Sequence, residues 1–294
     1  MVFEICDATR DDDGEDIADE LLIEEDSIPK YLWKYWRKRN QIFSKFNEGV
    51  WINEQGWYSV TPEDVAINIA THVTKHTPAS PLTILDGFAG TGANAIHFAR
   101  QASVRRVIAI EKDATTLRCA MHNAKLYGVA EKIEFVLGDY FDFVEHFAGK
   151  SERWRVENRV DVVFLSPPWG GPGYRYDEVL DLEKMQPYSV SEILNAAYKL
   201  TTNIALYIPR TSDIIQLRNI VEYQYTQSSF HSRSSSDDDD DDDDDDSSSK
   251  GFSEQEKILL SYLHEDGHCV AICAYLGALA VPAMKDYGVV LIED

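Results

Sequence analysis

The residues best suited to chemistry in this sequence follow four apolar runs that have the composition of β-strands. Asp86, Glu111 and Asp139 each lie at the end of such a run, and Ser166 begins an unusual SPPW turn after a fourth run. Because the carboxyl ends of parallel strands meet at one edge of a sheet, we expect these side chains to lie close together. Three carboxylates there suit a ligand that carries positive charge and hydroxyl groups.

A glycine-rich turn, GFAGTGANA, joins the first of these strands to a helix. Gly90, Gly92 and Ala95 fit the G-x-G-x-x-[GA] fingerprint of dinucleotide sites, and Glu111 lies 19 residues after Gly92. Glycines let a backbone approach a ligand closely, and the acid can accept hydrogen bonds from ribose hydroxyls. The pattern alone also fits a nicotinamide dehydrogenase, although no His, Lys and Tyr constellation stands out beside the turn.

Asp86 separates the candidate cofactors. It lies four residues before Gly90, where a carboxylate would repel a pyrophosphate but attract the cationic aminoacyl end of S-adenosylmethionine (SAM). Asp139, in VLGDYF, would meet the adenine amino group in this arrangement. The sequence therefore predicts a SAM site with acids at the ends of three successive strands.

The SPPW turn at residues 166–169 suits methyl transfer to an exocyclic amine. That reaction mainly requires the amine to be aligned with the sulfonium methyl, so proximity supplies most of the acceleration. The Ser166 hydroxyl or carbonyl and the Pro167 carbonyl can hold the amine N–H groups and stabilise the charge that grows on nitrogen. Proline keeps the turn rigid. Trp169 offers a face on which a base can stack, more strongly if the base is cationic.

Alternating strands and helices position these residues. The runs LTILDGF, RRVIAIEKD, KIEFVLGD, VDVVFL and NIALYIPR are predicted strands, separated by predicted helices in GANAIHFARQA, residues 114–127, residues 140–149 and VSEILNAAYKL. RNIVEYQY is expected to be a closing helix or strand, and HCVAICAYLGAL a final strand. This alternation predicts a parallel sheet with right-handed crossovers.

Negative charge is concentrated in two stretches. The net charge of −23 includes −11 in residues 1–26 and ten consecutive Asp at 237–246, which leaves −2 for the rest. Both stretches are expected to stay unfolded, because the negative charges within each stretch repel one another and little apolar surface is available for burial. We therefore predict an acidic disordered leader at 1–28 and a methyltransferase domain at 81–294 with a low-complexity Ser/Asp insertion at about 228–257.

Cysteine spacing and the N-terminal sequence predict the compartment. The four Cys form no CxxC pair and no zinc spacing, so we expect a reducing compartment and no metal site. No secretory signal and no apolar run of membrane-spanning length is visible, so a soluble intracellular protein is expected.

A basic and aromatic segment, PKYLWKYWRKRNQIFSKF, opens a predicted helical extension at residues 29–80. Six Lys and Arg lie among apolar residues at near-helical spacing, which fits either a solvated helix face or a surface for RNA phosphates. Further along, Thr61 as N-cap and Pro62 at the first helical position predict another helix.

The run VVFLSPPWGGPGY resembles the trimethylguanosine synthase family of RNA cap-hypermethylating enzymes. The likeness extends to KYWRKRNQIFSKFNEGV, GWYSVTPE, DGFAGTGANAIHFA, VIAIEKD, KIEFVLGD and YIPR, and it covers about residues 30–215 and the last strand. It implies an α/β fold with the Rossmann-like parallel sheet of class I methyltransferases, an antiparallel last strand and a helical N-terminal extension.

The resemblance also implies a substrate and a location. The substrate would be the 7-methylguanosine cap of small nuclear and nucleolar RNAs, methylated twice at guanine N2 to give 2,2,7-trimethylguanosine. Trp169 would stack on the cationic base, Ser166 and Pro167 would position N2, and Arg210 would meet the cap phosphates. The protein would be nuclear or nucleolar, and also cytoplasmic. The acidic tracts would either stay solvated or contact basic nuclear proteins.

Together these interpretations assign three sets of site residues, of which the catalytic set is Ser166, Pro167 and Trp169. The residues expected at the cofactor are Tyr58, Thr61, Asp86, Phe88, Gly90, Gly92, Asn94, Glu111, Asp139 and Tyr140, and those expected at the substrate are Ser166, Trp169, Tyr174 and Arg210. The chain departs from the family at Ala93 and Ala95, which flank Asn94 where a Gly-Asn-Thr run is usual, and at Glu111, where Asp is usual. A Thr role at residue 95 is therefore not carried over.

Two other functions are compatible with these motifs. The general Pro-Pro-aromatic motif also permits an N2-guanine or N6-adenine methyltransferase that acts on internal positions of rRNA, tRNA or DNA. A cap-binding or assembly protein that kept the fold but lost methyl transfer is a third possibility, although the intact acids and SPPW turn argue against it.

Overall fold

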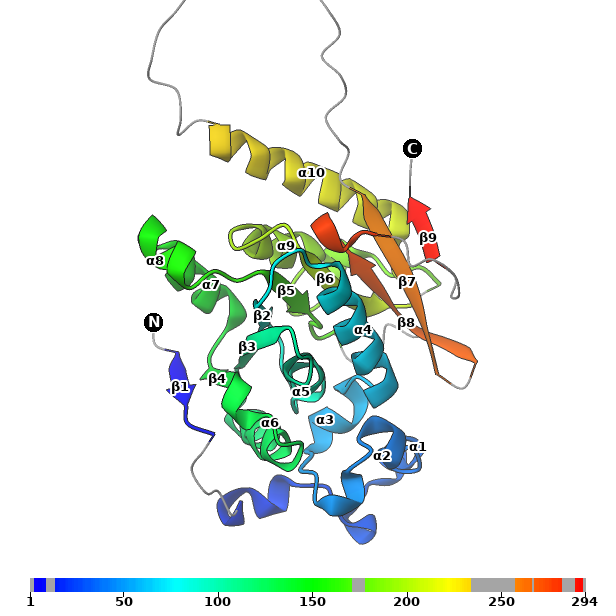
Figure 1. The fold of residues 1–294 in the computed structure, drawn as a ribbon. Coiled ribbons are helices and arrows are strands. Elements are labelled where there is room, and N and C mark those ends of the chain that lie inside the picture. Colours follow the sequence, from blue (N-terminus) through cyan, green and yellow to red (C-terminus); the bar gives the residue numbers. More distant parts are fainter. Residues whose placement is uncertain are drawn as a thin grey trace, which may run out of the picture.

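The computed structural model describes residues 3–8, 14–170, 178–233, 257–265, 267–281 and 289–292. The strands in these ranges are β1 (Glu4–Cys6), β2 (Leu82–Asp86), β3 (Val104–Glu111), β4 (Ile133–Leu137), β5 (Val162–Leu165), β6 (Ile204–Pro209), β7 (Ile258–Glu265), β8 (His268–Tyr275) and β9 (Val289–Ile292). They form one sheet in the order β1-β4-β3-β2-β5-β6-β8-β7-β9 (Figure 1).

The five central strands of the sheet, β4, β3, β2, β5 and β6, are parallel to one another. β8 lies antiparallel beside β6, which confirms the expected parallel sheet with an antiparallel strand near the C-terminus. β7 and β9 were not predicted. β7 follows directly on the low-complexity insertion and forms an antiparallel hairpin with β8. All five parallel strands end at the same edge, where the predicted acids and the SPPW turn were expected.

Helices cover both faces of the sheet. The α-helices are α1 (Trp33–Trp36), α2 (Arg39–Ile42), α3 (Glu54–Ser59), α4 (Glu63–His76), α5 (Ala93–Ala99), α6 (Ala114–Leu126), α7 (Tyr140–Ala148), α8 (Glu152–Glu157), α9 (Val190–Tyr198) and α10 (Ile214–Arg233). The 3-10 helices are η1 (Glu15–Glu20), η2 (Glu25–Ser27), η3 (Lys30–Leu32), η4 (Phe46–Glu48), η5 (Ala130–Lys132), η7 (Leu182–Lys184) and η8 (Gly277–Leu279). No helix in these ranges is both long and apolar enough to cross a bilayer.

Alternate residues of each central strand feed two separate cores. Ile84 of β2 and Val107 of β3 pack in the core that also holds α4, α5 and α6. Their neighbours Leu85 and Ile108 point to the other face and pack with α7, α9 and α10. Successive side chains of a strand alternate between faces, so a sheet covered on both sides needs an unbroken apolar run. This explains why the strands are almost entirely apolar up to the acids that end them.

The N-terminal extension is held together by aromatic side chains. Trp36, Phe46 and Trp57 surround one another with ring centroids 5.4 to 5.7 Å apart. Figure 1 shows α1, α2 and α3 grouped at one end of α4, near α6. The aromatic spacing of the segment at 29–46 therefore serves packing at these positions.

The described part of the acidic leader is ordered, contrary to prediction. β1 pairs antiparallel with β4, and Ile17 of η1 is only 5% exposed. Asp16 forms two hydrogen bonds, of 2.8 and 2.9 Å, with the guanidinium of Arg118 on α6. A few apolar residues and one ion pair thus hold this part of the leader on the domain despite its charge.

Two predicted boundaries also differ. Thr61 does not cap α4, because its hydroxyl accepts a hydrogen bond from Asn94 Nδ2 at 2.9 Å; α4 begins at Glu63, after Pro62. RNIVEYQY is helical, and α10 continues to Arg233, past the expected start of the insertion at 228, because no Gly or Pro interrupts it. The Ser/Asp run itself lies outside the described residues.

Candidate functional site

The glycine turn between β2 and α5 needs its glycines for two different reasons. Gly90 and Gly92 have φ values of +54° and +93°, a region that other residues rarely adopt. A Cβ at Gly90 would have no atom within 4 Å, so this side of the turn is open. A Cβ at Gly92 would lie 3.1 Å from the backbone of Ala120 on α6. Gly90 therefore leaves room for a ligand, whereas Gly92 lets α5 pack closely on α6.

Asp86, the last residue of β2, carries a fully buried carboxylate. Its Oδ1 accepts a hydrogen bond from the Phe88 N–H at 3.3 Å, but Oδ2 has no partner among the described residues. Burial, with a smaller contribution from the charge of Glu111, raises the pKa of Asp86 to about 7. A cationic ligand would satisfy the second oxygen and favour the ionised form.

Glu111, at the end of β3, is fixed beside the glycine turn. Its Oε2 accepts a hydrogen bond from the Gly90 N–H and its Oε1 accepts one from the Asp113 N–H, both at 3.0 Å. Burial raises the pKa of Glu111. Each carboxylate oxygen can accept a second hydrogen bond, so the group can also receive hydroxyls of a ligand.

Asp139 lies just beyond β4, and both of its carboxylate oxygens have protein partners. Oδ1 caps α7 by accepting a hydrogen bond from the Phe141 N–H at 2.8 Å, and Oδ2 accepts one from the Tyr188 hydroxyl at 2.7 Å. Burial and this hydrogen bond raise the pKa of Tyr188 to about 12. No sequence motif marked Tyr188, which lies in the loop before α9. It holds the Asp139 carboxylate in a fixed orientation.

Polar groups with unmet hydrogen-bonding capacity gather around the glycine turn. Besides Asp86 Oδ2, the buried atoms Thr91 Oγ1 and Asn94 Oδ1 have no hydrogen-bond partner among the described residues. Asn94 is held from its other side, where Nδ2 donates to Thr61. Because buried polar groups are almost always paired, these atoms indicate contact with a ligand. An ammonium or hydroxyl group fits them, so the residues present fit SAM.

Three aromatic residues predicted at the cofactor lie in different environments. Phe88 is half-buried and contacts Tyr140, with ring centroids 5.3 Å apart. Tyr140 is a core residue, 2% exposed, whose hydroxyl donates to the Ile193 carbonyl at 3.4 Å, so only its main chain could face a cofactor. Tyr58 is 46% exposed on α3, and within the described ranges no hydrogen bond joins it to the glycine turn.

The SPPW turn lies directly beside the glycine turn. β5 pairs with β2, and the Ser166 hydroxyl donates a hydrogen bond to the Phe88 carbonyl at 3.3 Å. Its lone pairs are left as acceptors. Pro167 is buried. The structure therefore brings the two motifs at 86–95 and 166–169 together, as their places after adjacent parallel strands required.

The other predicted substrate residues spread outward from this turn. Trp169 is half-buried and packs against Tyr207 of β6, with ring centroids 5.4 Å apart and 34° between the planes. Arg210 is exposed in the turn after β6, near Cys269, where its charge opposes the rise that burial causes in the pKa of that thiol. Tyr174 lies outside the described residues.

Asn123 on α6 joins the extension to the glycine turn, a role that no sequence motif indicated. It is fully buried. Its Oδ1 accepts from the Trp51 N–H at 2.8 Å, and its Nδ2 donates to the carbonyls of Trp51 and Thr91 at 2.9 and 3.0 Å. An Asn inside a helix was the only signal available, and such residues are common. No group of three or more potential metal ligands occurs in the described ranges.

Comparison with known proteins agrees with this arrangement. Residues 82–279 match the family described as RNA cap guanine-N2 methyltransferase. The chain is 38% identical over 191 residues to a trimethylguanosine synthase of Schizosaccharomyces pombe, covering 65% of this chain and 75% of that protein. It is 35% identical over 188 residues to a trimethylguanosine synthase of Saccharomyces cerevisiae, covering 63% of this chain and 57% of that protein.

The fold has a counterpart among solved structures. A methyltransferase structure from Porphyromonas gingivalis W83 superposes with a TM-score of 0.56 at 10% identity, covering 88% of this chain and 54% of that one. At such low identity the likeness concerns the fold alone. The family match spans well over half of the residues and includes the acids, the glycine turn and the SPPW turn. This chain therefore belongs to the RNA cap guanine-N2 methyltransferase family.

Proposed function

We propose that this protein transfers methyl groups from SAM to N2 of the 7-methylguanosine cap of small nuclear and nucleolar RNAs, giving 2,2,7-trimethylguanosine. The family supplies the reaction, guanine-N2 methylation of an RNA cap with SAM as cofactor. The choice of RNAs rests on the resemblance alone. The observation that carries the proposal is the buried, half-satisfied Asp86 carboxylate beside the SPPW turn.

The cofactor would lie along the ends of β2, β3 and β4. Asp86 and Asn94 have the unpaired acceptors for the aminoacyl end, Glu111 can accept the ribose hydroxyls, and Asp139 can share an oxygen between Tyr188 and the adenine amino group. When bound there, SAM supplies an electrophilic methyl on a sulfonium. The chain contributes orientation and a buried negative charge that favours a cationic ligand.

The cap guanine would lie against the SPPW turn. Ser166 and Pro167 offer oxygen acceptors for the N2 hydrogens, which holds the amine in line and stabilises the positive charge that develops on nitrogen. Trp169 packs on Tyr207 and is only half-buried, so we expect its exposed part to offer a surface for a base. The positive charge of 7-methylguanine strengthens stacking on an indole.

The cap phosphates and the RNA would contact basic side chains. Arg210 is exposed at the same edge of the sheet. In the extension, four of the six basic residues have intramolecular partners: Lys34 Nζ lies 4.7 Å from the ring centroid of Tyr35, Lys38 pairs with Glu265, Arg39 donates to the Trp36 carbonyl, and Lys45 donates to the Leu126 carbonyl. The exposed Lys30 and Arg37 are the first candidates in that segment for contact with RNA phosphates.

The location and protein partners follow from the proposed substrates. Small nuclear and nucleolar RNAs place their modifying enzymes in the nucleus or nucleolus, with a cytoplasmic pool where the substrate RNAs pass through the cytoplasm. The acidic tracts would be available to basic nuclear proteins. Imaging of the full chain and of a variant without the ten-Asp run would test both points.

The decisive experiment compares methyl acceptors. Purified protein with methyl-labelled SAM should label 7-methyl-GTP and 7-methylguanosine-capped RNA, and should label GTP and uncapped RNA far less. Mass spectrometry of the product should show one and then two added methyl groups. Labelling of uncapped RNA in preference to every 7-methylguanosine compound would instead favour a methyltransferase of internal positions.

A further inference from the structure

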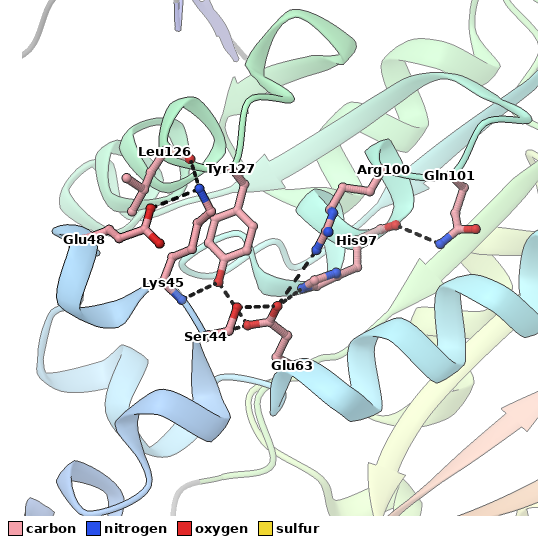
Figure 2. A network of polar contacts seen from close by, with 9 residues as sticks. All are labelled: Ser44, Lys45, Glu48, Glu63, His97, Arg100, Gln101, Leu126 and Tyr127. Atoms are coloured by element: carbon pink, nitrogen blue, oxygen red, sulfur yellow. Dashed lines mark hydrogen bonds and ion pairs between the residues drawn. The ribbon is translucent and has the colours of Figure 1, made fainter.

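One buried carboxylate joins the N-terminal extension to the methyltransferase domain. Glu63, the first residue of α4, is 7% exposed. Its oxygens accept hydrogen bonds from the Ser44 N–H, from the Ser44 hydroxyl at 2.9 Å and from the Tyr127 hydroxyl at 3.0 Å. Figure 2 shows Ser44 and Tyr127 on one side of the carboxylate and His97 and Arg100 on the other. A buried carboxylate requires such donors, because desolvation without them is costly.

The partners of Glu63 come from three other parts of the chain. Ser44 lies between α2 and η4 of the extension, Tyr127 follows the last turn of α6, and His97 lies on α5 with Nε2 3.6 Å from Oε1 of Glu63. Burial lowers the pKa of His97, although the charge of Glu63 opposes this shift, and this burial favours the neutral imidazole. The guanidinium of Arg100, 3.9 Å from Oε1, supplies positive charge at the exposed side.

The same segment of chain also contacts the cofactor side of α5. Thr61, two residues before Glu63, accepts the hydrogen bond from Asn94 Nδ2. Asn94 and His97 are three residues apart and therefore lie on the same face of α5, one turn after the other. Residues 61–63 thus contact α5 at two points: Thr61 accepts a hydrogen bond at the turn that begins at Gly92, and Glu63 lies against His97 one turn further on.

We propose that Glu63 is a positioning residue for the cofactor site. By fixing the start of α4 between the extension, α5 and α6, its carboxylate keeps the Thr61 hydroxyl where it orients the Asn94 amide. The Asn94 oxygen, buried and unpaired, is then left to the ligand. The inference rests on the proposed function, because SAM is taken as that ligand. Glu63 would then affect the affinity for the cofactor although it lies outside the cofactor site.

Glu63→Gln tests the proposal with little change in volume. The amide places an N–H₂ group where one carboxylate oxygen now accepts, so it opposes the Ser44 or Tyr127 donors. We expect the Kd for S-adenosylhomocysteine, measured by calorimetry, to rise about tenfold, which corresponds to about 1.4 kcal/mol. Tyr127→Phe removes only one donor and should raise this Kd by about threefold or less.

Asp161→Asn is the matched control. Asp161 is also a buried carboxylate, 7% exposed, and it accepts from the Thr83 N–H at 2.8 Å and pairs with Arg159. It precedes β5 and so lies at the opposite edge of the sheet from the cofactor site. This variant should lower the melting temperature and leave the Kd for S-adenosylhomocysteine unchanged.

A double-mutant cycle separates positioning from stability. Thr61→Val removes the acceptor for Asn94 without touching Glu63, and we expect its effect on the Kd to be strongly non-additive with that of Glu63→Gln. If Glu63→Gln does not fold, Ser44→Ala, which keeps the carboxylate, takes its place in the cycle. A lowered melting temperature with unchanged Kd, or fully additive effects, would show that Glu63 only stabilises the fold. If the unmutated protein binds no S-adenosylhomocysteine, the proposed function fails, and this inference with it.

Discussion

The edge of the sheet where the strands end has two halves of opposite character. On the half formed by β2, β3 and β4, the functional groups are acids that accept hydrogen bonds from backbone N–H groups; Asp86 is fully buried, and Glu111 and Asp139 are half-buried. On the half formed by β5 and β6, the corresponding groups are a half-buried Trp169 and an exposed Arg210. One half suits a small cation enclosed by protein, and the other suits a flat base with trailing phosphates. Charge and burial along one edge thus indicate two ligands that meet between Asp86 and Ser166.

The largest expected effect tests whether the half formed by β2, β3 and β4 binds only the cofactor. Asp86→Asn should weaken binding of SAM by about 100-fold, since a buried charge-assisted hydrogen bond contributes about 3 kcal/mol. Binding of 7-methyl-GTP should change less than twofold. The ligand-free protein should not be destabilised, because Asn removes a buried charge that lacks a full set of partners. Calorimetry with SAM and with 7-methyl-GTP measures the two changes in affinity. Equal losses of affinity for both ligands would contradict the division into halves.

The next effect tests the other half. Trp169→Ala should weaken binding of 7-methyl-GTP by about 10- to 100-fold, because stacking on an aromatic side chain contributes about 1–3 kcal/mol per base. The affinity for SAM should stay the same. Trp169→Phe keeps a stacking surface and should lose less. A comparable loss of SAM affinity in Trp169→Ala would mean that the indole supports the turn through its contact with Tyr207 and does not bind the base.

The pH dependence should also differ between the halves. Burial raises the pKa of Asp86 to about 7 in the ligand-free protein, so the carboxyl is increasingly protonated below that pH, whereas a cationic ligand needs it ionised. SAM affinity should therefore fall about tenfold per pH unit below pH 7. Affinity for 7-methyl-GTP, measured in parallel, should lack this step, and Asp86→Asn should abolish it for SAM.

Stability of the ligand-free protein should change with pH in the opposite direction. A carboxyl with a raised pKa in the folded state holds its proton up to about pH 7, whereas the unfolded chain loses it near pH 4. Between these values the folded state binds more protons, so this contribution to stability declines as pH rises. Chemical denaturation of the protein and of Asp86→Asn across this range would isolate the contribution.

The smallest expected effect tests whether Arg210 belongs to the half formed by β5 and β6, where the cap would bind. Arg210→Ala should weaken binding of 7-methyl-GTP by about fivefold and lower the salt dependence of capped RNA binding by about one unit of slope. Binding of the nucleoside 7-methylguanosine, which has no phosphates, should not change. Arg153→Ala, which removes an exposed Arg from α8, is the matched control. Equal losses for nucleoside and nucleotide would assign Arg210 to the base or to the fold.

Most site residues on the half formed by β2, β3 and β4 were predictable, because the sequence patterns that mark them are local. An apolar run that ends in an acid, followed by Gly90 and Gly92, specifies both a strand and the edge at which its acid lies. The parallel topology then brings Asp86, Glu111 and Asp139 together without any further information. By contrast, Tyr140 was expected at the cofactor, but its side chain lies in the core. Its position beside Asp139 did not reveal which way the ring points.

What the sequence determined by itself is therefore the order of the five parallel strands, the edge that carries the site, and the family. Tertiary structure decided which side chains hold that site in place. Glu63 meets Ser44 and Tyr127 across 19 and 64 residues, and Asn123 meets Trp51 across 72. Such contacts have no period and no fixed spacing, because they arise where separately folded segments pack. The ordered part of the acidic leader has the same origin: its apolar residues find a surface only once α6 and β4 have formed.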